Sequence, residues 1–200
     1  MRAGWILRPN ARSDIARRLR DREGVPLAEV YTFLSALYFR GKLAYARAFA
    51  NPPPSMAGVM IITPTAGLMA DGATVRLSTL RGFSRVPIHL KNRRYRTTFL
   101  RGLRQLARDV GSDCEVILLG SIATGKYVDL VQQVFADQVK VPAEFVGLGD
   151  MSRGALLLQC VKERRELNYI PVATVCQRRR LSAPLETAQP PIVITTSIIY

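Results

Sequence analysis

Residues 114–131 read CEVILLGSIATGKYVDLV, an apolar run followed by a turn with two glycines and then by an amphipathic segment. The run at 114–120 is typical of a buried strand. From Tyr127 onward, apolar residues recur at positions i, i+3, i+4 and i+7, as in a helix packed on a sheet. A strand that leads through a short turn into a helix is the repeating unit of α/β proteins, and the stretch predicts such a unit.

The same pattern recurs on both sides of this stretch. Further strands are predicted at 58–64 (GVMIITP), 143–149 (AEFVGLG) and 168–175 (NYIPVATV), with helices between them, one of them at 95–110. Strand–helix–strand units normally pair their strands in parallel through right-handed crossovers. The sequence therefore predicts a Rossmann-like layered α/β fold, in which helices flank a mainly parallel central sheet.

The chain divides into three predicted parts. Residues 1–55 should form a helical, basic N-terminal portion that packs on the core, with Ser13 as the N-cap of one helix and Gly41 as a break between two others. Residues 56–175 should form the α/β core domain. Residues 176–200, which end in the apolar run QPPIVITTSIIY, are expected to be a C-terminal tail or an edge strand.

The turn after the strand at 114–120 has the spacing G-x-x-x-x-G-K of a phosphate-binding loop. Tyr127, however, stands where such a loop needs a small hydroxyl for magnesium, and its place in the apolar stripe predicts a core aromatic side chain instead. We therefore reject nucleotide hydrolysis by that mechanism. A more general anion site at a helix N-terminus remains. Its candidate ligand-binding residues are Gly120, Ser121, Thr124, Gly125 and Lys126.

Other polar residues follow two more of the predicted strands. Ligands of open α/β sheets bind at the carboxyl ends of the strands, so Thr65 and the GDMSRG segment should approach the same site. There Asp150 is the candidate catalytic acid or base, and Ser152 and Arg153 are candidate ligand-binding residues. The alternative is that GDMSRG is a helix-initiating turn in which Asp150 or Ser152 serves as the cap.

The net charge of +14 is confined to the first half of the chain. Residues 1–110 hold 20 Lys and Arg against 6 Asp and Glu, whereas residues 111–200 hold 9 of each. Clustered cations favour a polyanionic partner. The candidate nucleic-acid-binding residues lie opposite the apolar stripe of the predicted 95–110 helix: Arg94, Arg101, Arg104 and Arg108. The alternatives are an ordinary solvated helix face, or a genome whose composition yields 24 arginines and 5 lysines.

Metal, membrane and nucleophile signals are weak in this sequence. Three cysteines without a CxxC spacing and a single histidine provide no set of zinc ligands. His89 is expected to be a half-buried structural residue, and Asp71 a turn residue. Because the sequence shows neither a signal peptide nor a long apolar span, we expect a cytoplasmic protein without a membrane partner.

Three segments in succession, LYFRGKLAYARAFA, IITPTAGLM and CEVILLGSIATGKYVDLV, resemble small bacterial and phage Rossmann-like α/β proteins of unknown function. The resemblance covers about residues 34–160. It implies the layered fold and no particular activity. Thr65 and Ala66 depart from the pattern, which would have a lysine or tyrosine before the Gly-Leu pair.

These features lead to two main hypotheses about function. The first is a protein that binds a nucleotide-like or phosphorylated ligand at the strand ends, either as a hydrolase or transferase or as a sensor. The alternative is a non-enzymatic protein that binds DNA or RNA through its arginine-rich first half. A third hypothesis is a scaffold subunit whose basic surface meets an acidic protein. The sequence leaves the substrate, cofactor, metal requirement and oligomeric state open.

Overall fold

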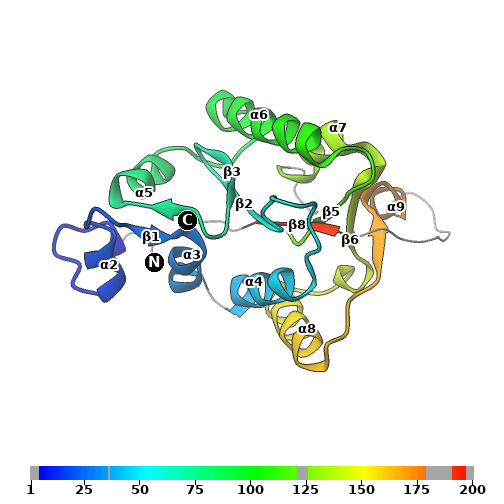
Figure 1. Cartoon of the computed structure of the whole chain (residues 1–200), viewed down its shortest axis with the longest axis horizontal. Helices are drawn as coiled ribbons and strands as arrows, with labels where there is room; N and C mark the ends of the chain where they lie inside the picture. The colour runs from blue at the N-terminus through cyan, green and yellow to red at the C-terminus, as the bar shows by residue number, and fades with distance from the viewer. Residues whose placement is uncertain (1–4, 36, 121–125, 179–190, 197–200) are drawn as a thin grey trace.

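The computed structural model describes residues 5–35, 37–120, 126–178 and 191–196 (Figure 1). Its strands are β1 (Val25–Pro26), β2 (Val59–Thr63), β3 (Gly67–Ala70), β4 (Thr74–Val75), β5 (Glu115–Leu118), β6 (Val139–Pro142), β7 (Tyr169–Pro171) and β8 (Pro191–Thr196). Its helices are α2 (Asp14–Arg18), α3 (Leu27–Leu34), α4 (Leu37–Phe49), α5 (Leu77–Ser84), α6 (Arg93–Val110), α7 (Val128–Phe135), α8 (Asp150–Glu163) and α9 (Val172–Arg178). Two 3₁₀ turns, η1 (Ala136–Gln138) and η2 (Ala143–Phe145), flank β6.

The central sheet is mixed, so the prediction of a Rossmann-like fold with a mainly parallel sheet is wrong. The six strands lie in the order β3-β2-β8-β5-β6-β7, and β1 pairs with β4 in a separate antiparallel sheet. Of the six strand pairs in the described residues, β1–β4, β2–β3 and β6–β7 are antiparallel. If β8 is set aside, the only parallel pair is β5–β6.

The path of the chain explains two of the antiparallel pairs, β2–β3 and β6–β7. Between β2 and β3 the chain turns back at once through residues 64–66, and Gly67 adopts a φ of +70° that favours glycine. After α8 the chain returns to the end of β6, where the backbone amide of Ala143 donates to the carbonyl of Asn168 over 2.8 Å. Strand β7 therefore starts beside the end of β6 and runs against it.

Two predicted strands are also placed wrongly. Ala136 ends α7 with a φ of +47°, and the strand that follows is β6 at Val139–Pro142 rather than residues 143–149. The predicted strand at 168–175 is extended only over Tyr169–Pro171, and α9 begins at Val172. Short apolar runs fit a buried strand and a buried helix equally well, so periodicity alone could not separate them.

Strand β8, from the predicted tail or edge strand, lies in the middle of the sheet. It pairs in parallel with β2 on one side and with β5 on the other, so that Ile194 lies opposite both Met60 and Leu118. A strand covered on both faces is expected to be apolar and uncharged, and PIVITT has that composition. A segment distant in sequence thus joins the two halves of the sheet.

Helices cover both faces of this sheet (Figure 1). Helices α4 and α8 lie side by side on one face, and α6 and α7 lie on the other. Successive strand residues alternate between two apolar cores: Ile61 and Ile117 pack on the α4–α8 side, whereas Ile62 and Val116 pack on the α6–α7 side.

The N-terminal helices partly follow the sequence prediction. The Ser13 hydroxyl caps α2 by accepting from the amide of Ala16 over 3.3 Å, as expected. Gly41, in contrast, does not break a helix, because α4 runs through it without interruption. The preceding helix α3 ends at Leu34, and Ser35 is extended. Gly41 instead lies where α4 meets α8, with Gly154 directly opposite.

Candidate functional site

Helix α6 presents the clearest candidate surface. The Asn92 side chain starts the helix by accepting from the amide of Tyr95 over 3.2 Å, and Gly111 follows its last residue. One side of the helix is buried and consists of Tyr95, Phe99, Leu103, Leu106 and Val110. All six of its arginines are exposed: Arg93, Arg94, Arg96, Arg101, Arg104 and Arg108.

Close backbone contacts hold α6 on the sheet. Gly67 in β3 lies so near the helix that a Cβ there would be 2.7 Å from the carbonyl oxygen of Thr98. A Cβ on Gly102 would likewise approach the backbone nitrogen of Leu68 to 3.1 Å. Two glycines at the same contact allow the helix and β3 to approach closely, so the arginines project from a well-supported helix.

The stretch of chain that contains α5 and most of α6 carries positively charged side chains and no negatively charged ones. Residues 72–108 contain ten Lys and Arg and no Asp or Glu, which amounts to +10 of the net +14. Nine of these cations form what we call the α5–α6 basic surface: Arg81, Arg85, Lys91, Arg93, Arg94, Arg96, Arg101, Arg104 and Arg108. The tenth, Arg76, donates instead to the backbone carbonyl of Arg22.

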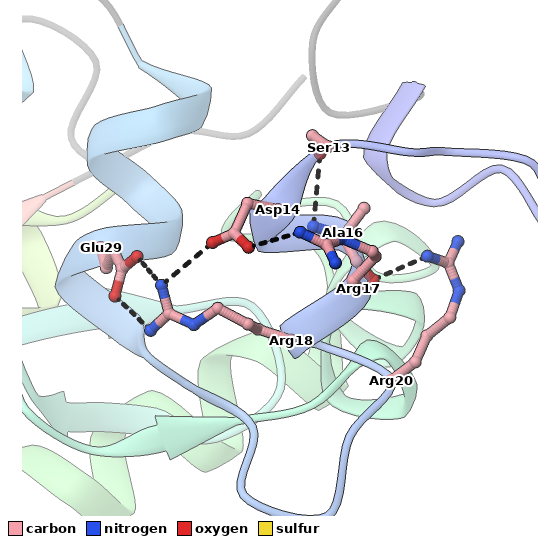
Figure 2. Close-up of polar contacts among 7 residues, drawn as sticks. All are labelled: Ser13, Asp14, Ala16, Arg17, Arg18, Arg20 and Glu29. Carbon is pink, nitrogen blue, oxygen red and sulfur yellow. Dashed lines mark hydrogen bonds and ion pairs between the residues drawn. The ribbon is translucent and has the colours of Figure 1, made fainter.

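Two sets of arginines within the described residues differ in their partners. Arg17 and Arg18 of α2, and Arg20 just after it, have structural partners (Figure 2). Arg17 pairs with Asp14 at 2.9 Å, Arg18 forms a two-pronged ion pair with Glu29, and Arg20 donates to four backbone carbonyls. On the α5–α6 basic surface no side chain pairs with a described acid, and only Arg108 has a hydrogen-bond partner, Gln105.

The four predicted nucleic-acid residues, Arg94, Arg101, Arg104 and Arg108, thus lie on an exposed and unneutralised surface. Sequence reasoning missed the rest of this surface, although the absence of acids between Asp71 and Asp109 would have revealed it. His89 lies in the connection between α5 and α6. It is exposed rather than half-buried, and its Nδ1 accepts from the backbone amide of Lys91 over 3.1 Å.

The predicted phosphate turn is described only at its two ends. Gly120 is buried after β5, whereas Ser121, Thr124 and Gly125 lie outside the described residues. The backbone carbonyl of Lys126 accepts from the Tyr95 hydroxyl over 3.0 Å, and its Nζ lies 5.4 Å from the centre of the Tyr127 ring. Tyr127 is 1% exposed, which confirms it as a core aromatic.

The GDMSRG segment forms the start of α8. Its N-cap is Gly149 without a side-chain cap, so the predicted capping by Asp150 or Ser152 is wrong. Ser152 and Asp150 are exposed. Arg153 donates to the backbone carbonyl of Phe145 over 2.9 and 3.2 Å, and its guanidinium lies 5.3 Å from the centre of the Phe145 ring. It also lies 3.8 Å from the Asp150 carboxylate. Its guanidinium therefore ties α8 to η2.

Lys42 is an unexpected neighbour of this segment. It is only 3% exposed, and its Nζ lies 4.5 Å from the ring centre of Tyr38 and 5.8 Å from that of Phe39. Burial lowers the pKa of Lys42 to about 7, with Asp150 opposing the shift and Arg153 adding to it. The sequence carried a signal, because Phe39, Lys42, Leu43 and Ala46 share one helical stripe.

The predicted strand-end residues are distributed over two layers. Lys126 contacts Tyr95 and Tyr127 on the α6–α7 side, whereas Asp150 and Arg153 belong to α8 on the opposite side. Thr65 is half-buried in the β2–β3 turn, near Gly82 of α5. The structure brings Asp150, Arg153 and Lys42 together at the start of α8.

The described residues hold no group of three or more His, Cys, Asp or Glu side chains placed to bind a metal ion. Among the helices that the structure describes, none has the length and apolar character needed to span a membrane. Comparisons with protein-family models, with curated proteins and with solved structures returned no match.

Proposed function

We propose that this protein binds nucleic acid through the α5–α6 basic surface. One observation carries the proposal: nine cations, all exposed, occur in a stretch of chain without a single acid. A protein surface normally mixes charges of both signs, and an all-positive one costs folding free energy through self-repulsion. A polyanionic partner would turn that cost into binding free energy.

The chemistry of these side chains fits phosphate. Eight of the nine cations are arginines, whose planar guanidinium donates two parallel hydrogen bonds to phosphate oxygens. Binding of several phosphates would release condensed counterions, so the affinity should fall steeply as the salt concentration rises. An acidic protein would attract the same surface, but without the uniform spacing of charges that a nucleic acid offers to a row of arginines.

The test is the salt dependence of binding to nucleic acid. Fluorescence anisotropy with labelled oligonucleotides between 50 and 200 mM salt should give a steep negative slope of log K against log salt. The variant R101A/R104A/R108A should bind at least about tenfold more weakly and show a slope smaller by about 2.7 units.

A matched control removes three exposed cations from the opposite layer, in the variant R40A/K162A/R164A. It has the same net charge as the α6 variant and should retain most of the binding. Absence of salt-dependent binding by the parent protein would contradict the proposal. If both triple variants weaken binding equally, binding depends on the net charge of the protein and not on the α5–α6 basic surface.

A second proposal places a nucleotide-like or phosphorylated small ligand near the start of α8. It is favoured by the buried amine of Lys42, because strongly perturbed ionisable groups concentrate at functional sites. The cluster follows the end of β6, where ligands of α/β sheets commonly bind. Arg153 would supply positive charge, and Asp150 would orient the ligand or transfer a proton in a hydrolase or transferase.

Calorimetry with a panel of nucleotides and sugar phosphates would test this second proposal. We expect saturable binding that inorganic phosphate competes for, weakened in both Arg153→Ala and Asp150→Asn. If no compound of the panel binds, or if both variants bind as tightly as the parent protein, the small-ligand proposal fails. The nucleic-acid proposal would be unaffected, since neither residue belongs to the α5–α6 basic surface.

A further inference from the structure

The geometry of the α5–α6 basic surface points to one kind of nucleic acid. We infer that its partner is double-stranded DNA, rather than a single strand or duplex RNA. This inference rests on the proposed nucleic-acid function and adds the form of the partner. It depends on how the arginines are spaced, on which side chains the surface lacks, and on the shape of α6.

The spacing of the arginines is regular and fixed by the helix. Arg94, Arg101 and Arg108 are seven residues apart, so they lie almost in line on the outward side of α6, roughly 10 Å from one to the next. Arg93 and Arg104 lie beside this line. Because the backbone carrying them is held against β3, the charges keep their spacing, which suits a duplex with regularly placed phosphates.

The α5–α6 basic surface also lacks the row of exposed aromatic rings that proteins use to bind single-stranded nucleic acid. Proteins that hold single strands stack bases on exposed aromatic rings, at roughly 1–3 kcal/mol per base. In residues 72–108 the rings of Phe83, Tyr95 and Phe99 are at most 3% exposed and belong to the cores, which leaves the His89 imidazole as the one exposed ring of this stretch. A single strand would find one imidazole before α6 and no row of rings along the helix, whereas a duplex needs none because its bases already stack on each other.

The exposed ridge of α6 distinguishes DNA from duplex RNA. The major groove of B-form DNA is about 12 Å wide and admits an α-helix. The major groove of A-form RNA is too deep and narrow to receive one. The helix has 18 residues and would extend roughly 27 Å along a groove. Arg81 and Arg85 of the preceding segment and Lys91 add positive charge before its N-terminus.

Contacts with phosphates should dominate over base reading. Among the uncharged polar side chains of α6, Gln105 already donates to Asp109 over 2.7 Å and accepts from Arg108. Asn92, just before the helix, is used as its cap. With these amides occupied, the exposed Thr97 hydroxyl and the arginines are left to meet the duplex, and the arginines match phosphate oxygens with two-pronged hydrogen bonds.

The test compares three probes of equal length and mixed sequence: a 24-base-pair DNA duplex, one of its single strands and the corresponding RNA duplex. At about 100 mM salt the DNA duplex should bind at least about fivefold more tightly than either of the other probes. The variant R94Q/R101Q/R108Q removes the line of charge, and its salt slope on the DNA duplex should be smaller by about 2.7 units. Thermal unfolding of this variant checks that it remains folded.

The outcomes separate the two proposals. If no probe binds, both the nucleic-acid function and the inference fail. If the single strand or the RNA duplex binds as tightly as the DNA duplex, and the glutamine variant weakens that binding, nucleic-acid binding stands and the inference is overturned. A variant that keeps its fold and the parental affinity for the DNA duplex would also overturn it, because the line of arginines would then not carry the contact.

Discussion

The hydroxyl of Tyr95 donates a 3.0 Å hydrogen bond to the backbone carbonyl of Lys126, although the two residues are 31 positions apart. Tyr95 lies on the buried side of α6 and is 0% exposed, and burial raises the pKa of its phenol, which keeps the donor protonated. The bond fixes the first turn of α6 to the segment that leads into α7. The orientation of the arginine-bearing helix therefore depends on a contact with the end of the predicted phosphate turn.

Tyr95→Phe should reduce stability without reducing nucleic-acid binding. The change removes one buried hydrogen bond and leaves the Lys126 carbonyl without this donor, at a cost of roughly 1–2 kcal/mol. The ring itself and its packing on Phe99, with centroids 5.5 Å apart, would remain. Urea unfolding measures the first effect and anisotropy the second. Weakened binding with unchanged stability would show that the hydroxyl does something other than hold the helix.

Gly154→Ala should destabilise the contact between α4 and α8. A Cβ on Gly154 would lie 2.9 Å from the Cα of Tyr38, and one on Gly41 would lie 2.6 Å from the carbonyl oxygen of Gly154. Backbone atoms cannot rotate away, so the helices would have to separate, at roughly 1–3 kcal/mol. Gly72→Ala is the control, because a Cβ there has no heavy atom within 4 Å. Equal melting temperatures for the Gly154 and Gly72 variants would contradict the close packing.

Local patterns predicted the helices of this protein better than its sheet. The stripe of Phe99, Leu103, Leu106 and Val110 repeats at the helical period over several turns, and α6 forms over that range. Strand pairing, in contrast, joins segments that are distant in sequence. No local sequence pattern indicates that β8 lies between β2 and β5. Likewise, none indicates that the chain returns to the end of β6 after α8. The sheet direction therefore could not be read from the order of elements alone.

The candidate sites show the same difference between features set by local sequence and features set by long-range packing. The four arginines of α6 could be placed on one helix side from their spacing, and they are exposed there. Lys42 was overlooked because a lysine in a helical stripe usually extends to solvent, whereas here tertiary packing buries it, with Asp150 and Arg153 of α8 nearby. Arg153 could be assigned to the start of a helix, but its hydrogen bonds to Phe145 depend on the 3₁₀ turn that replaced the predicted strand.

Arg20→Ala should destabilise the protein more than Arg17→Ala. The guanidinium of Arg20 donates to the carbonyls of Arg8, Pro9, Ala11 and Ala16 over 2.7–3.2 Å, which closes the loop before α2. Figure 2 shows the bond to Ala16. Its loss would leave several carbonyls without that donor, and we expect a cost of about 1–2 kcal/mol.

Arg17 provides the matched arginine for that comparison. It forms an ion pair with Asp14 in which both side chains are more than half exposed, and such pairs add little to stability. Thermal unfolding of both variants, with Arg20→Lys as a third, measures the difference. A single ammonium cannot reach all four carbonyls, so the lysine should restore only part of the stability. If Arg17→Ala proved the more damaging change, the role assigned to Arg20 would be wrong.

Lys42→Met should stabilise the protein in a pH-dependent way. Burial lowers the pKa of Lys42 to about 7 in the folded protein from its ordinary value of 10.5, so between these values the unfolded chain binds more protons than the folded one. Stability should therefore rise as the pH increases from 7 toward 10.5, and below pH 7 the cost of the buried charge is present in full. Methionine fills similar volume without a charge. Its advantage should be largest near pH 6, at roughly 2–4 kcal/mol, and should shrink by pH 10.

Lys42→Arg separates charge from shape in this comparison, because arginine stays protonated throughout this range. It should be less stable than the parent protein at every pH, and the gap should widen as the parent loses its proton. Asp150 and Arg153 face Lys42 from α8. Its aromatic neighbour on α4 is Tyr38. Burial raises the pKa of Tyr38 to about 12, so its phenol stays neutral across the same pH range. Denaturant unfolding of the three proteins at pH 6, 8 and 10 decides the question. A constant difference between parent and Lys42→Met across that range would mean that the amine keeps one protonation state throughout.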